Sequence, residues 1–160
     1  MNETVEFSAT RTAEINESFS QLLERLQKQS QIDLLGETAF ETFIAEAGDG
    51  MVLFTQEPDQ QPETWDVAVI LPEVLKLTGN RLRAAIISPE LARKEKDRYG
   101  VTRWPSLVFV RDGGYVGVIG GMRNWDEYAR EIAELLEKPV GRAPSIGIPV
   151  MSTDAPSACH

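Results

Sequence analysis

The chain has 160 residues, a formal net charge of −9 and a single cysteine, Cys159. This length suits one domain of roughly 100–120 residues with tails. The acidic balance argues against nucleic-acid binding, which favours a basic face, and suits a soluble protein with a cationic partner. One cysteine excludes an internal disulfide and fits a reducing compartment. The apolar runs are too short for membrane insertion, and the N-terminus lacks the apolar segment of a secretory signal.

The N-terminal third combines an acidic segment with the first predicted elements. Residues 1–17 contain few apolar side chains, which predicts a flexible acidic arm. Ser18 is a suitable N-cap, and apolar residues recur at helical spacing from Phe19 to Leu26. The patterns that follow predict a strand over 32–35, a helix over 38–46 and a central, continuously apolar strand over 51–55.

The middle of the chain predicts a helix, a strand and a second helix. A polar loop over 56–63 precedes a helix over 66–76 that contains Pro72. The strand is predicted over 80–87. A helix over 90–98 follows, with Ser88 as its N-cap and Pro89 in its first turn.

The last part of the chain predicts a hairpin, a helix and a tail. Trp104-Pro105 leads into strands over 107–110 and 115–119, which an Asp-Gly-Gly turn joins. Asn124 is placed to cap a helix that buries Trp125 and ends at Pro139. Residues 140–160 are rich in Pro, Gly and Ser and predict a flexible tail. This leaves residues 18–139 as the folded domain.

The order of these elements predicts an α/β fold. A helix between the strands near residues 53 and 84 indicates a parallel pair with a right-handed connection. The hairpin adds antiparallel strands. The result is a mixed sheet with helices on both faces.

The segment from Tyr99 to Gly121 resembles the thioredoxin-like family in the order of its glycines, proline and apolar runs. The resemblance implies a thioredoxin-like three-layer sandwich with a mixed central sheet, an extra N-terminal helix and a cis Trp104–Pro105 bond. The residues that match the family pattern are Tyr99, Gly100, Val101, Pro105, Ser106, Asp112, Gly113 and Gly120.

The redox chemistry of that family is missing from this chain. Counting back from Pro72 places the Cys-x-x-Cys position on residues 64–67, which contain no sulfur. The buried carboxylate of the family is replaced by Leu53. Thiol–disulfide exchange needs both a thiolate and a resolving thiol, so we expect no dithiol oxidoreductase. Cys159 and His160 at the terminus make no closed metal site, and we expect no cofactor.

What remains is a surface that could bind a peptide. The backbone of the residue before a cis proline can pair with a passing strand, and here that residue is Trp104. Fold analogy brings Trp65, Trp104 and Met122 together, with an acidic rim. The alternative is that Trp65 and Trp104 pack under the loop. The predicted partner-binding residues are Trp65, Trp104, Pro105, Gly121, Met122, Glu57, Asp59, Glu63 and Asp66.

Residues 18–139 look like a redox-inactive branch, the hydrogenase-1 expression protein family. The resemblance rests on the segments 49–54, 98–109 and 113–128, and on the acidic loop that replaces Cys-x-x-Cys. It implies a cytoplasmic assembly chaperone for [NiFe] hydrogenase. The implied partners are the hydrogenase small-subunit precursor, including its twin-arginine signal peptide, and other hydrogenase maturation proteins.

Two other function classes stay open at this point. One is a thioredoxin-superfamily enzyme that uses a single thiol. The other is a structural scaffold subunit in a larger complex. An insulin-reduction assay separates the first from a chaperone, and a stable stoichiometric complex would favour the second.

Overall fold

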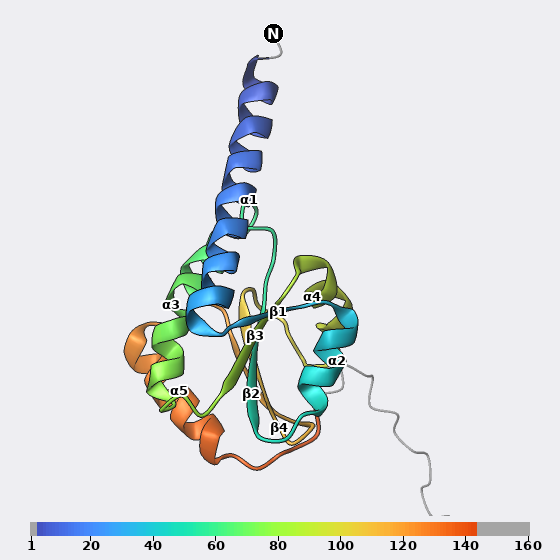
Figure 1. The fold of residues 1–160 in the computed structure, drawn as a ribbon, viewed down its shortest axis with the longest axis vertical. Helices are drawn as coiled ribbons and strands as arrows, with labels where there is room; N and C mark the ends of the chain where they lie inside the picture. The colour runs from blue at the N-terminus through green and yellow to red at the C-terminus, as the bar shows by residue number, and fades with distance from the viewer. Residues whose placement is uncertain (1–2, 144–160) are drawn as a thin grey trace, which may run out of the picture.

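A five-stranded sheet between two layers of helices forms the body of the computed structural model, which describes residues 3–143 (Figure 1). Helices α3 and α5 lie on one face of the sheet, and α2 and α4 lie on the other (Figure 1). The elements are α1 (Glu3–Ser30), β1 (Asp33–Leu35), α2 (Glu37–Ala45), β2 (Asp49–Phe54), α3 (Glu63–Leu77), β3 (Arg83–Ile87), α4 (Pro89–Glu95), β4 (Ser106–Arg111), β5 (Gly114–Gly120) and α5 (Trp125–Glu137).

The strand order β1-β3-β2-β4-β5 confirms the predicted mixed sheet. β1, β3 and β2 are parallel, with Val52 opposite Ala85, whereas β4 and β5 form an antiparallel hairpin against β2. β2 lies between β3 and β4. Its continuously apolar sequence suits this central position, because a central strand is covered by helices on both faces. The predicted thioredoxin-like fold with an additional N-terminal helix is confirmed.

Alternate residues of the strands divide the apolar side chains into two core clusters. Met51 and Leu53 belong to the cluster beneath α1, α3 and α5. Val52 and Phe54 belong to the cluster beneath α2 and α4. Successive side chains of a strand point to opposite faces, so each helical layer has its own core.

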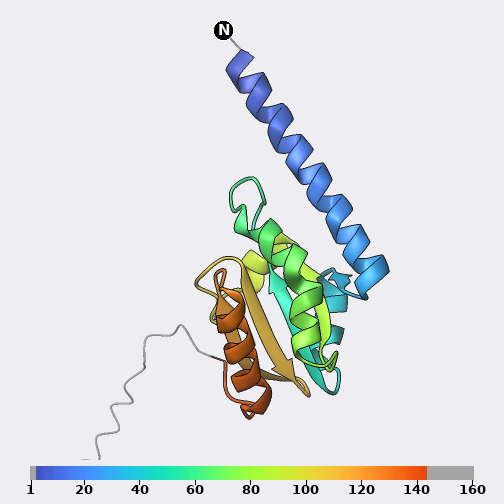
Figure 2. The ribbon, with the colours of Figure 1, turned by 90° about the vertical axis from the view of Figure 1, so that its left-hand side faces the viewer.

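Helix α1 is longer than the sequence analysis predicts. The prediction that this helix begins at Ser18 is wrong, because the helix begins at Glu3. Thr12, Ile15 and Phe19 are spaced by three and four residues, so they share one helix face. This face continues on both sides of Ser18, the predicted start of the helix. Its C-terminal half lies against the domain, and its N-terminal end extends beyond it (Figure 2).

Most of the predicted turns and caps are confirmed. The Trp104–Pro105 bond is cis. The hairpin turn uses positive φ angles at Asp112 and Gly113, as an Asp-Gly turn requires. Asn124 caps α5 in a capping box with Glu127. The tail over 140–160 falls mostly outside the described residues, as does Cys159.

Trp125 corrects a second prediction. It was expected in the core, but its side chain is 44% exposed. Trp125 is the first residue of α5, directly after the Asn124 cap. Tyr128 and Ile132, one and two turns later, are the residues of α5 that are buried.

Tyr99 offers a test of the second core cluster. Its ring packs against Phe40 and Phe54, and its hydroxyl has no hydrogen-bond partner among the described residues. Burial raises the pKa of Tyr99 to about 12, although Arg98 opposes the shift. The unfolded chain ionises near pH 10, so stability is lost as the pH rises from about 10 towards 12.

We expect Tyr99→Phe to be neutral or slightly stabilising at pH 7, because it removes an unpaired buried hydroxyl. The variant should also flatten the loss of stability between pH 10 and 12. Urea melts at pH 7 and across that alkaline range test both statements. A clear destabilisation at pH 7 would show that the hydroxyl has a partner.

Candidate functional site

The residues that occupy the Cys-x-x-Cys position of the redox-active family lie at the start of α3. Residues 64–67 fall in its first turn, as predicted. Thr64 is fully buried there, and its hydroxyl faces the Gln56 amide at 3.5 Å. Leu53 in β2 is also fully buried. An apolar and neutral interior therefore replaces the sulfur and carboxylate groups of the redox enzymes.

The cis proline and the end of β5 lie side by side. The Gly121 amide donates to the Pro105 carbonyl at 2.7 Å. The Ser106 hydroxyl donates to the Arg103 carbonyl at 2.5 Å, which closes the loop before β4. Within residues 3–143 no hydrogen bond reaches the backbone of Trp104. The cis-proline surface, as we call Trp104, Pro105, Gly121 and Met122, thus keeps a backbone donor and an acceptor available.

Trp65 lies against α1. Its ring centroid is 5.7 Å from that of Phe19, and the two planes are tilted by 44°. Trp65 is half-buried and Phe19 is buried. The side chain therefore joins α3 to a helix that the sequence analysis treated partly as an arm.

A cavity of about 940 Å³ opens between α1 and the loop that precedes α3. Its charged side chains are Glu14, Asp59 and Asp66, against the single cation Arg11. Trp65, Ile15 and two prolines supply the apolar part of its wall. We call this cavity the acidic groove.

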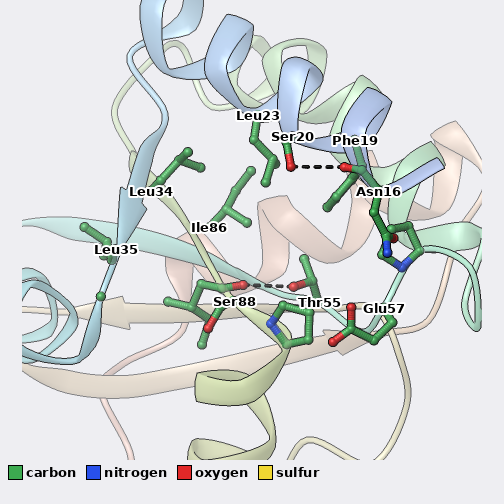
Figure 3. A pocket seen from close by; sticks show the side chains of 14 residues that line it. Asn16, Phe19, Ser20, Leu23, Leu34, Leu35, Thr55, Glu57, Ile86 and Ser88 are labelled. Atoms are coloured by element: carbon green, nitrogen blue, oxygen red, sulfur yellow. Dashed lines mark hydrogen bonds between the residues drawn. The ribbon is translucent and has the colours of Figure 1, made fainter. Parts of the chain in front are cut away.

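A second cavity, of about 530 Å³, is lined by Glu57 and Pro58 of the same loop (Figure 3). Phe19 and Leu23 of α1 face Leu34 and Ile86 across it, at the carboxyl ends of the parallel strands (Figure 3). Glu57 stands at its rim, 4.0 Å from Arg93. We call it the apolar cavity. Pro58 lines both cavities, so they adjoin.

The structure distributes the predicted site residues over the two cavities and the cis-proline surface. Trp65 packs against the first core cluster and Trp104 against the second, on the opposite face of the sheet. Asp59 and Asp66 join Trp65 in the acidic groove, and Glu57 lines the apolar cavity. Glu63 is exposed and accepts a hydrogen bond from Gln61. The remaining predicted residues form the cis-proline surface.

The sequence analysis missed the α1 side of both cavities. Arg11, Glu14, Ile15 and Phe19 form this wall. The signal that could have found it is Ile15, four residues before Phe19 and therefore on the same helix face.

Metal and membrane chemistry find no support in the described part of the chain. Residues 3–143 hold no group of three side chains suited to bind a metal ion. No helix in the same range is both long and apolar enough to cross a membrane.

Comparison with known proteins gives the family. Residues 22–128 match the model of "Hydrogenase-1 expression protein HyaE". The chain belongs to this family. It is 42% identical over 141 residues to the hydrogenase expression/formation protein HoxO of Cupriavidus necator, covering 87% of this chain and 88% of the relative. It is 36% identical over 134 residues to HupG of Rhizobium leguminosarum bv. viciae, covering 81% and 90%.

Solved structures support the fold. The solution structure of oxidised thioredoxin from Plasmodium falciparum aligns with a TM-score of 0.53 at 15% identity, covering 64% of this chain and 95% of that one. The names of the family and of both relatives support a role in hydrogenase maturation. The family match begins at Leu22, so the α1 wall of the acidic groove lies before it.

Proposed function

We propose that this protein is a non-catalytic assembly chaperone that binds the precursor of the hydrogenase small subunit. The bound segment carries basic residues followed by apolar ones, as a twin-arginine signal peptide does. The proposal rests on the family and on the chemistry of the two cavities. It places the protein in the cytoplasm, where such a precursor is made.

The observation that carries the proposal is the junction of the acidic groove with the apolar cavity at Pro58. Three carboxylates, Glu14, Asp59 and Asp66, lie on one side of this residue. Leucine, isoleucine and phenylalanine side chains lie on the other. A basic segment and an apolar segment that follow each other in one peptide would find complementary surroundings in these two neighbouring cavities.

The cis-proline surface gives this peptide a second point of attachment. The unpaired backbone of Trp104 is suited to hydrogen-bond an extended chain, which adds affinity without sequence selectivity. Selectivity then comes from the side chains of the two cavities. The absence of thiols at residues 64–67 favours holding a client over oxidising it.

Binding to synthetic peptides tests the proposal. A labelled twin-arginine signal peptide would be titrated with the full chain, next to the same peptide with both arginines replaced by glutamine. We expect saturable binding of the first and at least tenfold weaker binding of the second. The small-subunit precursor should bind, and a precursor without its signal peptide should not. Equal affinity for both peptides would overturn the proposed charge recognition.

The same preparation tests the enzymatic alternative. We expect no insulin reduction with dithiothreitol above the uncatalysed rate. Cys159→Ser should leave peptide binding unchanged. Catalysed reduction that disappears in this variant would instead identify a monothiol enzyme.

A further inference from the structure

A third cavity lies beside β1, the outermost strand of the sheet, and has a volume of about 1040 Å³. Asp33 and Leu35 of β1 line it, together with Arg83 at the start of β3. Residues of α1 and α3 from one face of the sheet and of α2 from the other complete its wall, so the cavity lies at the border of the sheet. We call it the sheet-edge groove. It shares Leu35 with the apolar cavity, and the proposed function uses none of its other lining residues.

The strand beside this groove has an open edge. Within the described part of the chain, β1 pairs only with β3, in parallel register over all three of its residues. The backbone groups on its other side therefore have no partner strand. Such an edge is a template on which an extended chain can add as a further strand.

Three helices end at the sheet-edge groove. α1 ends at Ser30, α2 at Ala45 and α3 at Leu77, and each contributes lining residues from its last turn or from the residues directly after it. The free carbonyl groups at a helix C-terminus carry about half a negative charge, which favours a cation nearby. The carboxylates of Asp33 and Glu46 add to this field.

Arg83 is the only cation among the described residues that line the groove, and α2 already uses it. Its Nη1 donates to the Phe43 carbonyl and to the Glu46 carboxylate, both at 2.9 Å. Its guanidinium carbon also lies 4.6 Å from the centroid of the Phe43 ring. Asp33 is exposed and makes no ion pair with any residue that the structure describes. One carboxylate of the groove therefore stays without a counter-charge.

Two carboxamide side chains border the groove from left-handed backbone positions. Gln31 follows α1 with a φ of +54°, and Asn80 follows α3 with a φ of +58°. Such positions after a helix favour glycine; asparagine tolerates them, whereas glutamine is strained there. No hydrogen bond of the described residues uses the Gln31 carboxamide, so nothing in the fold offsets this cost. A carboxamide can both donate to and accept from the backbone of a bound peptide.

We propose that the sheet-edge groove binds an extended segment of a partner protein that carries a lysine or arginine side chain. The segment adds to the open edge of β1, and its cationic head pairs with Asp33. The aliphatic stem lies on the buried side chains of Phe43, Leu75 and Leu82, as long cationic side chains do on apolar surfaces. A second copy of this chain is a poor occupant, because its own β1 carries Asp33 and no cation.

NMR titration of the isotope-labelled full-length protein with three capped pentapeptides tests the proposal. The peptides share the sequence Ser-Val-X-Val-Ser, in which valine favours an extended chain and X is lysine, norleucine or glutamate. We expect the lysine peptide to shift the amide signals of residues 30–35 and 80–84 saturably. The norleucine peptide keeps the stem without the charge and should bind about fivefold more weakly, and the glutamate peptide more weakly still.

Two variants separate binding from folding. Gln31→Gly relieves the left-handed backbone, so this variant should be at least as stable as the parent protein and yet bind the lysine peptide more weakly. Asp33→Asn should lower the affinity for the lysine peptide about fivefold and remove the preference for lysine over norleucine. The matched control Asp97→Asn removes an exposed carboxylate that does not line the groove, and it should bind like the parent protein.

Several results would overturn the proposal. They are the absence of saturable shifts in residues 30–35, equal affinity of the lysine and norleucine peptides, and affinity that neither Asp33→Asn nor Gln31→Gly changes. Shifts of the same residues on raising the protein concentration alone would also overturn it, because they would identify a second copy as the occupant. The signal peptide should bind the Asp33→Asn variant normally, since Asp33 lines neither cavity of the proposed function. Each hypothesis can therefore fail without the other.

Discussion

Replacing Phe19 with alanine is expected to lower the free energy of unfolding by about 3–5 kcal/mol, the usual cost of truncating a buried phenylalanine. Phe19 of α1 is 6% exposed. Its ring packs against Trp65, and its side chain lines the apolar cavity. The same change should weaken binding of the apolar part of the client, because Phe19 lines the apolar cavity and packs α1 against Trp65. Urea melts and titration of the signal peptide measure the two effects.

Trp65 provides the partner for a double-mutant cycle. If the Phe19–Trp65 contact fixes α1, the two alanine variants should be less than additive, with a coupling of about 0.5–1.5 kcal/mol. Trp125→Ala serves as the control, since its exposed side chain should change stability by about 0.5 kcal/mol or less. Additive losses at Phe19 and Trp65 would contradict the contact. A stable Phe19→Ala that still binds would contradict the role of α1.

The fold was predictable because each strand and helix carries its own local signal. The Asp112-Gly113 turn, the Ser88-Pro89 helix start and the Asn124 cap each determine a boundary through backbone chemistry within a few residues. The continuously apolar β2 indicates its central position in the same way. Such signals need no knowledge of distant contacts.

The site was less predictable, because it depends on how distant elements meet. The acidic residues around the start of α3 were identified, but the wall opposite them is α1, which packs on the domain through Phe19, Leu22 and Leu26. Trp125 was misplaced for a related reason. Helical spacing assigns it to the buried face, whereas Trp125 is the first residue of α5 and stays 44% exposed, ahead of the buried Tyr128 and Ile132.

Reversing the charge of the acidic groove is expected to have the largest effect on client binding. Glu14, Asp59 and Asp66 all line this cavity, and each would be changed to lysine in a triple variant. A basic peptide would then face three like charges in place of three opposite ones. Like charges brought together at an interface cost several kcal/mol, so we expect affinity to fall at least a hundredfold, which corresponds to about 3 kcal/mol.

The fold should tolerate these three changes. Asp59 and Asp66 are exposed, as is Glu14, and none of them makes an ion pair within the described residues. Melts of the triple variant should therefore match those of the parent protein to within about 1 kcal/mol.

A control with the same change of charge replaces Glu24, Glu90 and Glu134 with lysine. These residues are exposed and line neither cavity of the site. It should bind almost normally, because charges outside the contact act mainly on the rate of encounter. If both triple variants lose affinity equally, the net charge of −9 attracts the client and the groove does not select it. If only the groove variant fails, and its loss persists in 0.5 M salt where exposed charges are screened, the carboxylates contact the client directly.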